Sequence, residues 1–292
     1  MLRKIWFVCV LFCLFTDSYG QLLWKVTNKK SKKISYLYGT IHVADERAFV
    51  LKDKLLEKIG ACEVYAGEMI FDPQMIFAVL PKLFMGQDTT LQTLLTDEEY
   101  KIVKNILDEK LGMMSSMVER MKPVFTSLLL QEGKMGGTPS NKSKQGYKPL
   151  DLFLQEEADK RKLELVGLET LEEQMNVFDL MPVQKQAKAL YEEIVNSPQD
   201  TTSTTNMDKM LDWYAVQKLD SLYLYAAEEF KEDPNLGYAI LTKRNQNMAE
   251  RIEDIILKKS AFIAIGAAHL PDVQGVIELL RKRKFKVEPI KK

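Results

Sequence analysis

The sequence has 292 residues, with 41 basic and 41 acidic side chains and therefore a formal net charge of zero. A neutral chain without a long basic stripe does not match a nucleic-acid-binding protein. Hydrophobic residues make up 46% of the chain. A globular chain of this size buries roughly three quarters of its unfolded surface, so a core can stabilise the fold without disulfides.

The first twenty residues have the composition of a secretory signal. Two basic residues precede an apolar run over residues 5–15, and a small-residue cleavage site follows at Ser18-Tyr19-Gly20. The apolar run is too short to span a bilayer as a helix, which needs about 20 residues. We therefore predict that residues 1–20 are cleaved and that residues 21–292 form a single secreted or periplasmic domain without a stable membrane span. An uncleaved membrane anchor is the alternative.

The predicted mature chain keeps one cysteine, Cys62, because Cys9 and Cys13 lie within the predicted signal. An intramolecular disulfide is then impossible. Cys62 lies in an apolar run, so we expect a buried, unreactive thiol rather than a nucleophile. Asn141-Lys142-Ser143 matches a glycosylation sequon.

Short apolar runs rich in β-branched or aromatic residues predict strands near both ends of the chain. They are Leu22–Thr27, Ile34–His42, Cys62–Met69, Leu163–Glu169, Ala261–His269 and Phe285–Ile290. The basic cluster between the first two predicts a solvated hairpin turn.

Helical periodicity fills most of the remaining chain. The clearest segments are Asp97–Leu111, Leu150–Lys162, Leu171–Val195, Met207–Lys231 and Leu236–Lys259. Shorter helices are expected near Arg47–Ile59 and over Val273–Lys284, each between two predicted strands, which gives two βαβ units. The methionines Met113, Met114, Met117 and Met121 recur at helical spacing, which favours core positions.

This order of elements predicts an α/β fold with a mixed, largely parallel sheet and flanking helices. The sheet is expected from residues 21–70, 160–170 and 260–290. A large helical insertion or cap is expected over about residues 71–259.

Only two histidines occur in the chain, and each ends an apolar run in the same pattern, Gly39-x-x-His42 and Gly266-x-x-His269. Ligands of open α/β sheets collect beyond the carboxyl ends of the strands. If the two strands run parallel, both imidazoles open onto one edge of the sheet. Histidine at such an edge is suited to metal binding or to proton transfer.

A carboxylate follows a third predicted strand, where alternation places Val64, Ala66 and Glu68 on one face. A carboxylate that continues an apolar row is costly unless it is paired or bound to a cation. Two histidines and one glutamate leave positions open for water, as a catalytic metal site requires. An exposed carboxylate at the strand end is the alternative for Glu68.

Three further residues are candidates for the same site. Glu169 ends another strand and is either a second ligand or general base, or a charge that favours the start of the helix near Thr170. Arg244 and Asn245 lie on a helix with Met248 as an apolar companion. An arginine aimed at a cleft would bind a carboxylate or stabilise an oxyanion, and a generic helix-surface pair is the alternative.

Common catalytic motifs are absent from the sequence. It has no G-x-S-x-G, which disfavours a serine hydrolase of the nucleophile-elbow type. It also has no H-E-x-x-H, no Walker motif and no G-x-G-x-x-G after a strand.

Several segments in this order resemble the TraB/GumN/TIKI family over roughly residues 22–290. They are Tyr38-Gly-Thr-Ile-His42, the glutamate after Val64-Tyr-Ala-Gly67, Gly167-Leu-Glu-Thr-Leu-Glu-Glu-Gln174, Arg244–Ile252 and Ile265-Gly-Ala-Ala-His269-Leu-Pro271. One departure from the family pattern is Met248, at a position where family members often have an aromatic residue. This difference affects only the packing of the helix. The resemblance implies a divalent-metal site built from the two G-x-x-H histidines and the glutamate. In the TIKI branch it implies a secreted or membrane-tethered metalloprotease that uses manganese or cobalt. It also implies a distant kinship with erythromycin-esterase-like hydrolases, and some members, such as pheromone-shutdown proteins, have no demonstrated activity.

We therefore predict a secreted metal-dependent hydrolase, favouring a peptidase that acts on a peptide or protein. His42, His269 and Glu68 would bind the metal, with manganese or cobalt favoured by the resemblance and zinc as the alternative. Glu169 would act as a base or an outer ligand, and Arg244 with Asn245 would orient the substrate or its oxyanion. Two other functions stay open: a non-enzymatic peptide-binding or signalling-regulatory protein of the TraB type, and a metal-free hydrolase in which a histidine is the base.

Overall fold

The computed structural model describes residues 20–291 except 30, 73, 75–76, 78, 87, 137–146, 197–201 and 229. Residues 1–19 of the predicted signal and the Asn141 sequon therefore lie outside the described residues. None of the helices in the described part of the chain is long and apolar enough to cross a membrane.

The predicted strands form one six-stranded sheet in the order β4-β3-β5-β2-β1-β6. Their bounds are Leu23–Thr27 (β1), Ile34–Thr40 (β2), Val64–Gly67 (β3), Glu164–Gly167 (β4), Ala261–Gly266 (β5) and Lys286–Pro289 (β6). Strand β1 pairs antiparallel with both β2 and β6, while β2, β5, β3 and β4 pair parallel. The prediction of a mixed, largely parallel α/β sheet is confirmed, and so is the hairpin between β1 and β2.

Both predicted βαβ units are present, because the two strands of each run parallel, but in neither unit are the strands neighbours in the sheet. Strand β5 lies between β2 and β3, and β2 and β1 separate β5 from β6. The run Ala261–Ile265 is buried throughout. A strand this apolar needs pairing on both sides and covered faces, so the chain returns from residue 261 to the middle of the sheet.

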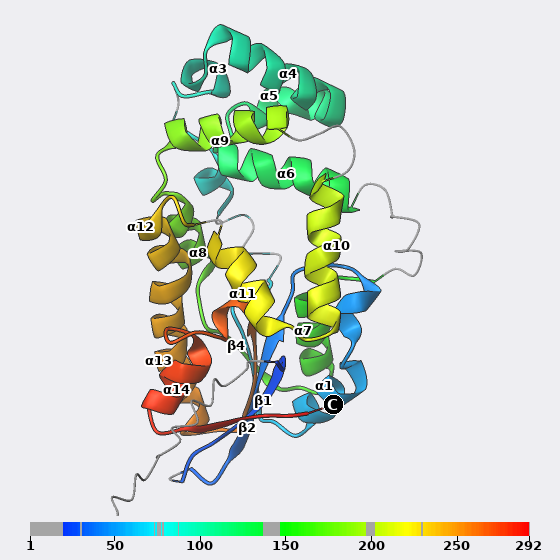
Figure 1. Ribbon diagram of the computed structural model, residues 1–292, viewed down its shortest axis with the longest axis vertical. Helices are drawn as coiled ribbons and strands as arrows, with labels where there is room; N and C mark the ends of the chain where they lie inside the picture. The colour runs from blue at the N-terminus through cyan, green and yellow to red at the C-terminus, as the bar shows by residue number, and fades with distance from the viewer. Residues whose placement is uncertain are drawn as a thin grey trace, which may run out of the picture.

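Helices cover both faces of this sheet (Figure 1). On one side lie α1 (Lys52–Gly60) and α7 (Leu150–Lys160), and on the other lie α13 (Arg244–Ile256) and α14 (Val276–Lys282). Short 3-10 helices follow two of the strands, η1 (Glu46–Phe49) after β2 and η5 (Ala267–His269) directly after β5. The large hydrophobic core lies between these layers and includes Leu37, Tyr65, Phe262, Ile263 and Ile252.

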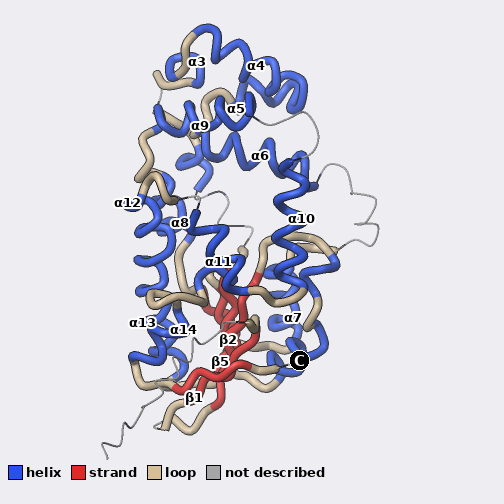
Figure 2. The backbone as a smooth tube through the Cα atoms, viewed as in Figure 1, coloured by secondary structure: helices blue, strands red, loops and turns tan. Residues whose placement is uncertain are grey.

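The middle of the chain is the expected helical insertion, interrupted by β4. Figure 2 shows its outer helices gathered at the end of the molecule away from the strands. They are α3 (Leu91–Leu94), α4 (Asp97–Leu111), α5 (Ser115–Val118), α6 (Pro123–Gly136) and α9 (Val183–Asn196), with short η2 (Leu80–Leu83) and η3 (Gly112–Met114) beside them. A second hydrophobic core, which includes Val103, Leu107 and Leu190, holds them together.

The remaining helices are α8 (Leu171–Phe178), α10 (Thr202–Ala215), α11 (Leu219–Glu228), α12 (Pro234–Gly237) and a π-helical turn, η4 (Tyr238–Lys243). The predicted helix Leu171–Val195 is thus broken before Pro182, whose ring cannot continue a helix. The predicted helix Met207–Lys231 breaks at Gln217, which has a φ of 60°.

The prediction for the methionines is wrong for three of four. The exposed fractions of Met113, Met114 and Met117 are 101%, 53% and 47%, and only Met121 is buried, at 6%. The helix ends at Leu111, and Gly112 adopts a φ of 53°. This turn interrupts the helical spacing, so the methionine row faces solvent.

We expect Cys62, which lies just before β3, to be an unreactive thiol. Burial, with the neighbouring charge of Glu63, raises the pKa of Cys62 to about 12. At pH 8 almost none of it is the reactive thiolate, so iodoacetamide should label the native protein far more slowly than the urea-unfolded protein. Cys62→Ala should fold and keep any activity, and equal labelling of both states would contradict this.

Candidate functional site

Four of the candidate residues follow the ends of neighbouring parallel strands. His42 follows β2, Glu68 follows β3, Glu169 follows β4, and His269 ends the turn after β5. The backbone ladder continues into this region, since Glu68 N donates to Ala264 O at 3.2 Å and Glu169 N donates to Glu68 O at 2.7 Å. The four side chains therefore start from one edge of the sheet.

Three of these side chains converge on Gly266. A Cβ placed on Gly266 would lie 3.0 Å from Glu68 Oε1, 3.5 Å from His269 Cδ2 and 3.7 Å from His42 Nε2. His269 Nε2 lies 3.7 Å from Glu68 Oε1. Two positions 227 residues apart in the chain thus face one point, because β2 and β5 are parallel neighbours with Thr40 opposite Gly266.

Each G-x-x-H pattern needs its glycine because neighbouring atoms lie too close to leave room for a side chain. At Gly266 a side chain would enter the space shared by the three polar groups. At Gly39 a Cβ would meet Leu270 Cδ1 at 2.9 Å and Ala267 Cα at 3.1 Å. The missing side chain of Gly39 therefore lets the turn that carries His269 pack directly onto β2.

The hydrogen bonds of His269 determine which ring nitrogen is free. Asn245 Nδ2 donates to the carbonyl of Gln274 at 2.9 Å, which makes Asn245 Oδ1 the acceptor that faces His269 Nδ1 at 2.6 Å. Nδ1 must then carry the proton, and the lone pair of Nε2 is free on the side of Glu68. Burial lowers the pKa of His269, which favours this neutral ring.

His42 is oriented by Asp151, a residue that the sequence analysis missed. Its Nδ1 donates to Asp151 Oδ2 at 2.8 Å, so Nε2 points to the Gly266 side. Desolvation disfavours the charged ring, but the hydrogen bond and charge of Asp151, with the charge of Glu68, raise the pKa of His42 to about 9. Asp151 lies in the first turn of α7, where an acidic residue ordinarily interacts only with the helix dipole.

Glu68 is a nearly buried anion, not the exposed carboxylate of the alternative reading. Its side chain is 11% exposed, and Oε1 accepts from Gly266 N at 2.5 Å while Oε2 accepts from Arg244 Nη2 at 3.0 Å. Burial would raise its pKa, but the charges of His42 and Arg244 and the Gly266 N–H favour the carboxylate and lower the pKa to about 2. Glu68 therefore stays charged at neutral pH.

Arg244 binds two carboxylates at once, so the generic helix-surface alternative is wrong for it. Nε donates to Glu169 Oε1 and Oε2 at 2.9 and 3.1 Å, and Nη2 donates to Glu169 Oε2 at 2.6 Å and to Glu68. Glu169 is 6% exposed and also accepts from Gln174 Nε2 at 3.3 Å. Arg244 starts α13 directly after the π-helical turn η4, and π-helical turns are frequent at functional sites.

The donor chemistry fits a divalent metal, although the side chains do not form a finished metal site. Among the described residues no group of three or more His, Cys, Asp or Glu side chains is close enough to hold an ion. The 3.7 Å between His269 Nε2 and Glu68 Oε1 is nonetheless near the spacing of two ligands, about 3.4 Å for tetrahedral bonds of about 2.1 Å. His42 Nε2 faces the same point, 3.7 Å from a Cβ placed on Gly266, and is the third donor of the set.

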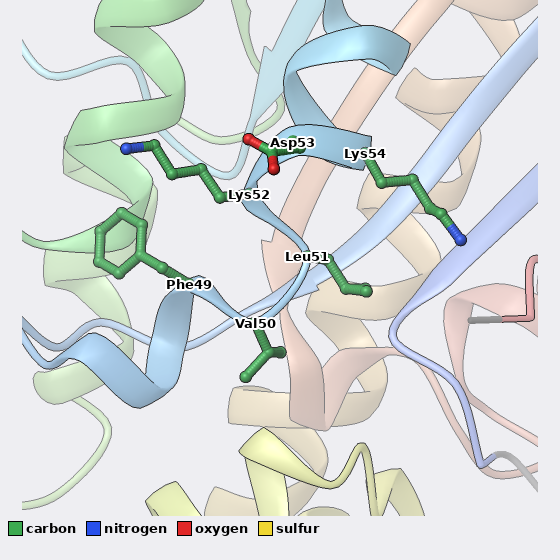
Figure 3. Close-up of a pocket in the computed structure, with 6 residues that line it drawn as sticks. All are labelled: Phe49, Val50, Leu51, Lys52, Asp53 and Lys54. Atoms are coloured by element: carbon green, nitrogen blue, oxygen red, sulfur yellow. The ribbon is translucent and has the colours of Figure 1, made fainter.

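A shallow cavity elsewhere does not coincide with this cluster. It has a volume of about 320 Å³, lies at the turn between η1 and α1, and is lined by Phe49, Val50, Leu51, Lys52, Asp53 and Lys54 (Figure 3). None of these residues belongs to the candidate site. The assignment of the site therefore rests on the convergence of its polar groups.

The model of the TraB/PrgY/gumN family matches residues 22–289. The chain belongs to this family. Its curated relatives include metalloprotease TIKI2 of Danio rerio, which is 24% identical over 325 residues. Metalloprotease TIKI1 of Danio rerio and of Homo sapiens are each 22% identical, over 317 and 320 residues. These alignments cover 92% of this chain but only 61–63% of the relatives, so the chain spans about three fifths of their length. No solved structure matches the chain.

Arg244→Met tests the charge balance of the cluster. It leaves two nearly buried carboxylates without their shared cation, and the free energy of unfolding at pH 7 should fall by about 3–5 kcal/mol. In the wild type, the lowered pKa of Glu68 stabilises the fold above the unfolded pKa near 4.5, and this contribution is lost as the pH falls toward 2. In the variant the pKa of Glu68 should rise, so its stability deficit should shrink as the pH is lowered from 7 to 5.

Urea unfolding at both pH values measures the deficit. Lys259→Met is the control, because it removes a cation from the exposed pair with Glu164 and should change little. If Arg244→Met loses little free energy of unfolding, or loses more at pH 5 than at pH 7, Arg244 is not the cation that balances Glu68 and Glu169.

Proposed function

We propose that this TraB-family chain is a secreted, divalent-metal-dependent peptidase with its active site at the carboxyl edge of the sheet. The observation that carries the proposal is the convergence of His42 Nε2, the Nε2 side of His269 and Glu68 Oε1 on Gly266. The names of the relatives, all metalloproteases, support both the dependence on a metal and a protein or peptide substrate. Cleavage of a signal is part of the proposal, and the exported protein should begin at Gln21 by mass spectrometry.

In this proposal His42, His269 and Glu68 hold the metal. Both imidazoles would bind through Nε2, because each Nδ1 donates to a fixed acceptor, Asp151 or Asn245. A bound divalent cation supplies Lewis-acid chemistry, which polarises the scissile carbonyl and activates water. Glu68 would supply the negative charge that makes the site selective for a cation over a neutral ligand.

The neighbouring residues would position these three groups. Asn245 is 2% exposed, and both polar atoms of its amide already have partners, so its role is to orient His269 rather than to contact a substrate. Glu169 is occupied by Arg244 and would act as an outer partner of the site rather than as the base. The Nη1 group of Arg244 makes only a long hydrogen bond, 3.5 Å to Ile240 O. It is therefore the donor of Arg244 best able to reach a substrate oxyanion.

We propose manganese or cobalt on the family resemblance, with zinc as the alternative, because two histidines and a glutamate also hold catalytic zinc. Two imidazoles and a carboxylate without a thiolate form a set of borderline and hard ligands, and carboxylate ligands suit manganese. Elemental analysis of protein purified without chelators identifies the metal directly.

Thermal melts with and without manganese test the ligands. A ligand that binds only the native state raises the melting temperature. The wild type should show this rise, and His42→Ala, His269→Ala and Glu68→Gln should lose most of it. Glu63→Gln is the matched control, because Glu63 lies at the opposite end of the same strand and pairs with Lys33; it should keep the rise. The same rise in wild type and Glu68→Gln would show that this glutamate does not bind the metal.

Peptide turnover separates the peptidase from its alternatives. A peptidase should cleave members of a peptide library only when loaded with metal, and His269→Ala should abolish cleavage. Metal binding without turnover would favour a peptide-binding or regulatory protein. Turnover that survives chelation would favour the metal-free hydrolase.

A further inference from the structure

One face of α7 contacts both of the loops that follow β2 and β3. Asp151 accepts from His42, and Gln155, one helical turn later, bonds the backbone of Phe71 on both sides: Phe71 N donates to its Oε1 at 2.8 Å, and its Nε2 donates to Phe71 O at 2.9 Å. Phe71 lies in the loop that starts with Glu68. Residues four apart share a helix face, so one rigid element fixes two of the segments that carry the proposed ligands.

The helix that carries Asp151 is itself firmly held. Leu150, next to Asp151, and Leu154 are fully buried in the large core. The backbone that carries Asp151 is therefore positioned by core packing and not by the His42 loop that its carboxylate contacts.

The two histidines need different amounts of support. The His269 side chain is 8% exposed and is held by packing as well as by Asn245. The His42 side chain is 64% exposed, so few neighbours limit the rotation of its ring. Within the described part of the chain, the ring of His42 hydrogen-bonds to the carboxylate of Asp151.

We propose that Asp151 is a positioning residue for His42: its carboxylate holds Nδ1–H and thereby keeps Nε2 directed at the Gly266 side of the site. An ionised carboxylate can only accept, so it selects the ring orientation in which Nδ1 is the donor. A carboxylate behind a histidine also makes the other nitrogen a stronger metal ligand. The proposal rests on the proposed metal-binding function, but the orientation of His42 can be measured without metal.

Nuclear magnetic resonance of the imidazoles tests the orientation, because the whole chain has only two histidines. In the metal-free protein labelled with ¹⁵N-histidine, both Nδ1 nitrogens should give resonances typical of a protonated nitrogen, and the signal lost in His42→Ala identifies His42. Asp151→Ala should abolish or strongly shift the His42 signal and leave that of His269 in place. Glu156→Gln, which removes another α7 carboxylate from a surface pair with Lys148, should change neither.

Asp151→Asn keeps the size of the side chain and serves if Asp151→Ala does not fold. It should still shift the Nδ1 resonance of His42, because the acceptor loses its charge. An unchanged His42 signal in a folded Asp151 variant would overturn the proposal, whatever the protein does with metals.

Metal affinity tests whether Asp151 acts through His42. Manganese affinity, measured by titration, should fall about 10- to 100-fold in Asp151→Ala. In a protein that already carries His42→Ala, adding Asp151→Ala should cause no further loss of affinity. A further loss in the double variant would overturn the positioning role. The His42 signal could shift as expected while neither the wild type nor any variant binds manganese. The proposed metal function would then fail, but the role of Asp151 in orienting His42 would stand.

Discussion

The architecture of the site follows from one buried charge. Glu68 continues the apolar row of a central parallel strand, and its carboxylate is 11% exposed. Burial of an unpaired carboxylate costs several kcal/mol, so the surrounding groups must be cations or N–H donors. Gly266 supplies a backbone N–H and Arg244 supplies a guanidinium. The remaining donors of the Arg244 guanidinium bind a second carboxylate, Glu169.

The sheet then brings the two imidazoles to that carboxylate. Parallel pairing of β2 with β5 places both histidine turns at one edge, and Gly39 and Gly266 remove the side chains that would separate them. Helices from opposite faces complete the arrangement, with Asn245 of α13 behind His269 and Asp151 of α7 behind His42. Each histidine thus has a partner that fixes its ring from a different layer of the fold.

The parts of this site that depend on local pattern could be predicted from the sequence. The strand ends were predictable because apolar runs stop at Gly39-x-x-His42, Gly67-Glu68 and Gly266-x-x-His269, and period-two alternation marked Glu68 as a carboxylate on a core face. The resemblance to the TraB/GumN/TIKI family is confirmed by the family match over residues 22–289.

The rest depends on contacts between distant segments. Strand order in a parallel sheet is non-local, so the insertion of β5 between β2 and β3 leaves no trace in either neighbour. Asp151 pairs with a histidine 109 residues earlier, and nothing around it distinguishes it from an ordinary acidic residue at a helix start. The exposed methionines follow from the turn at Gly112, a conformation that a helical spacing does not reveal.

Anomalous diffraction from crystals of the manganese-loaded protein tests the central claim most directly. We expect one strong manganese peak beside Gly266, about 2.0–2.2 Å from Nε2 of His42, Nε2 of His269 and an oxygen of Glu68, with Arg244 still bound to Glu169. A fully occupied manganese peak elsewhere on the protein would contradict this claim. So would a manganese-soaked crystal with no metal peak between the two imidazoles.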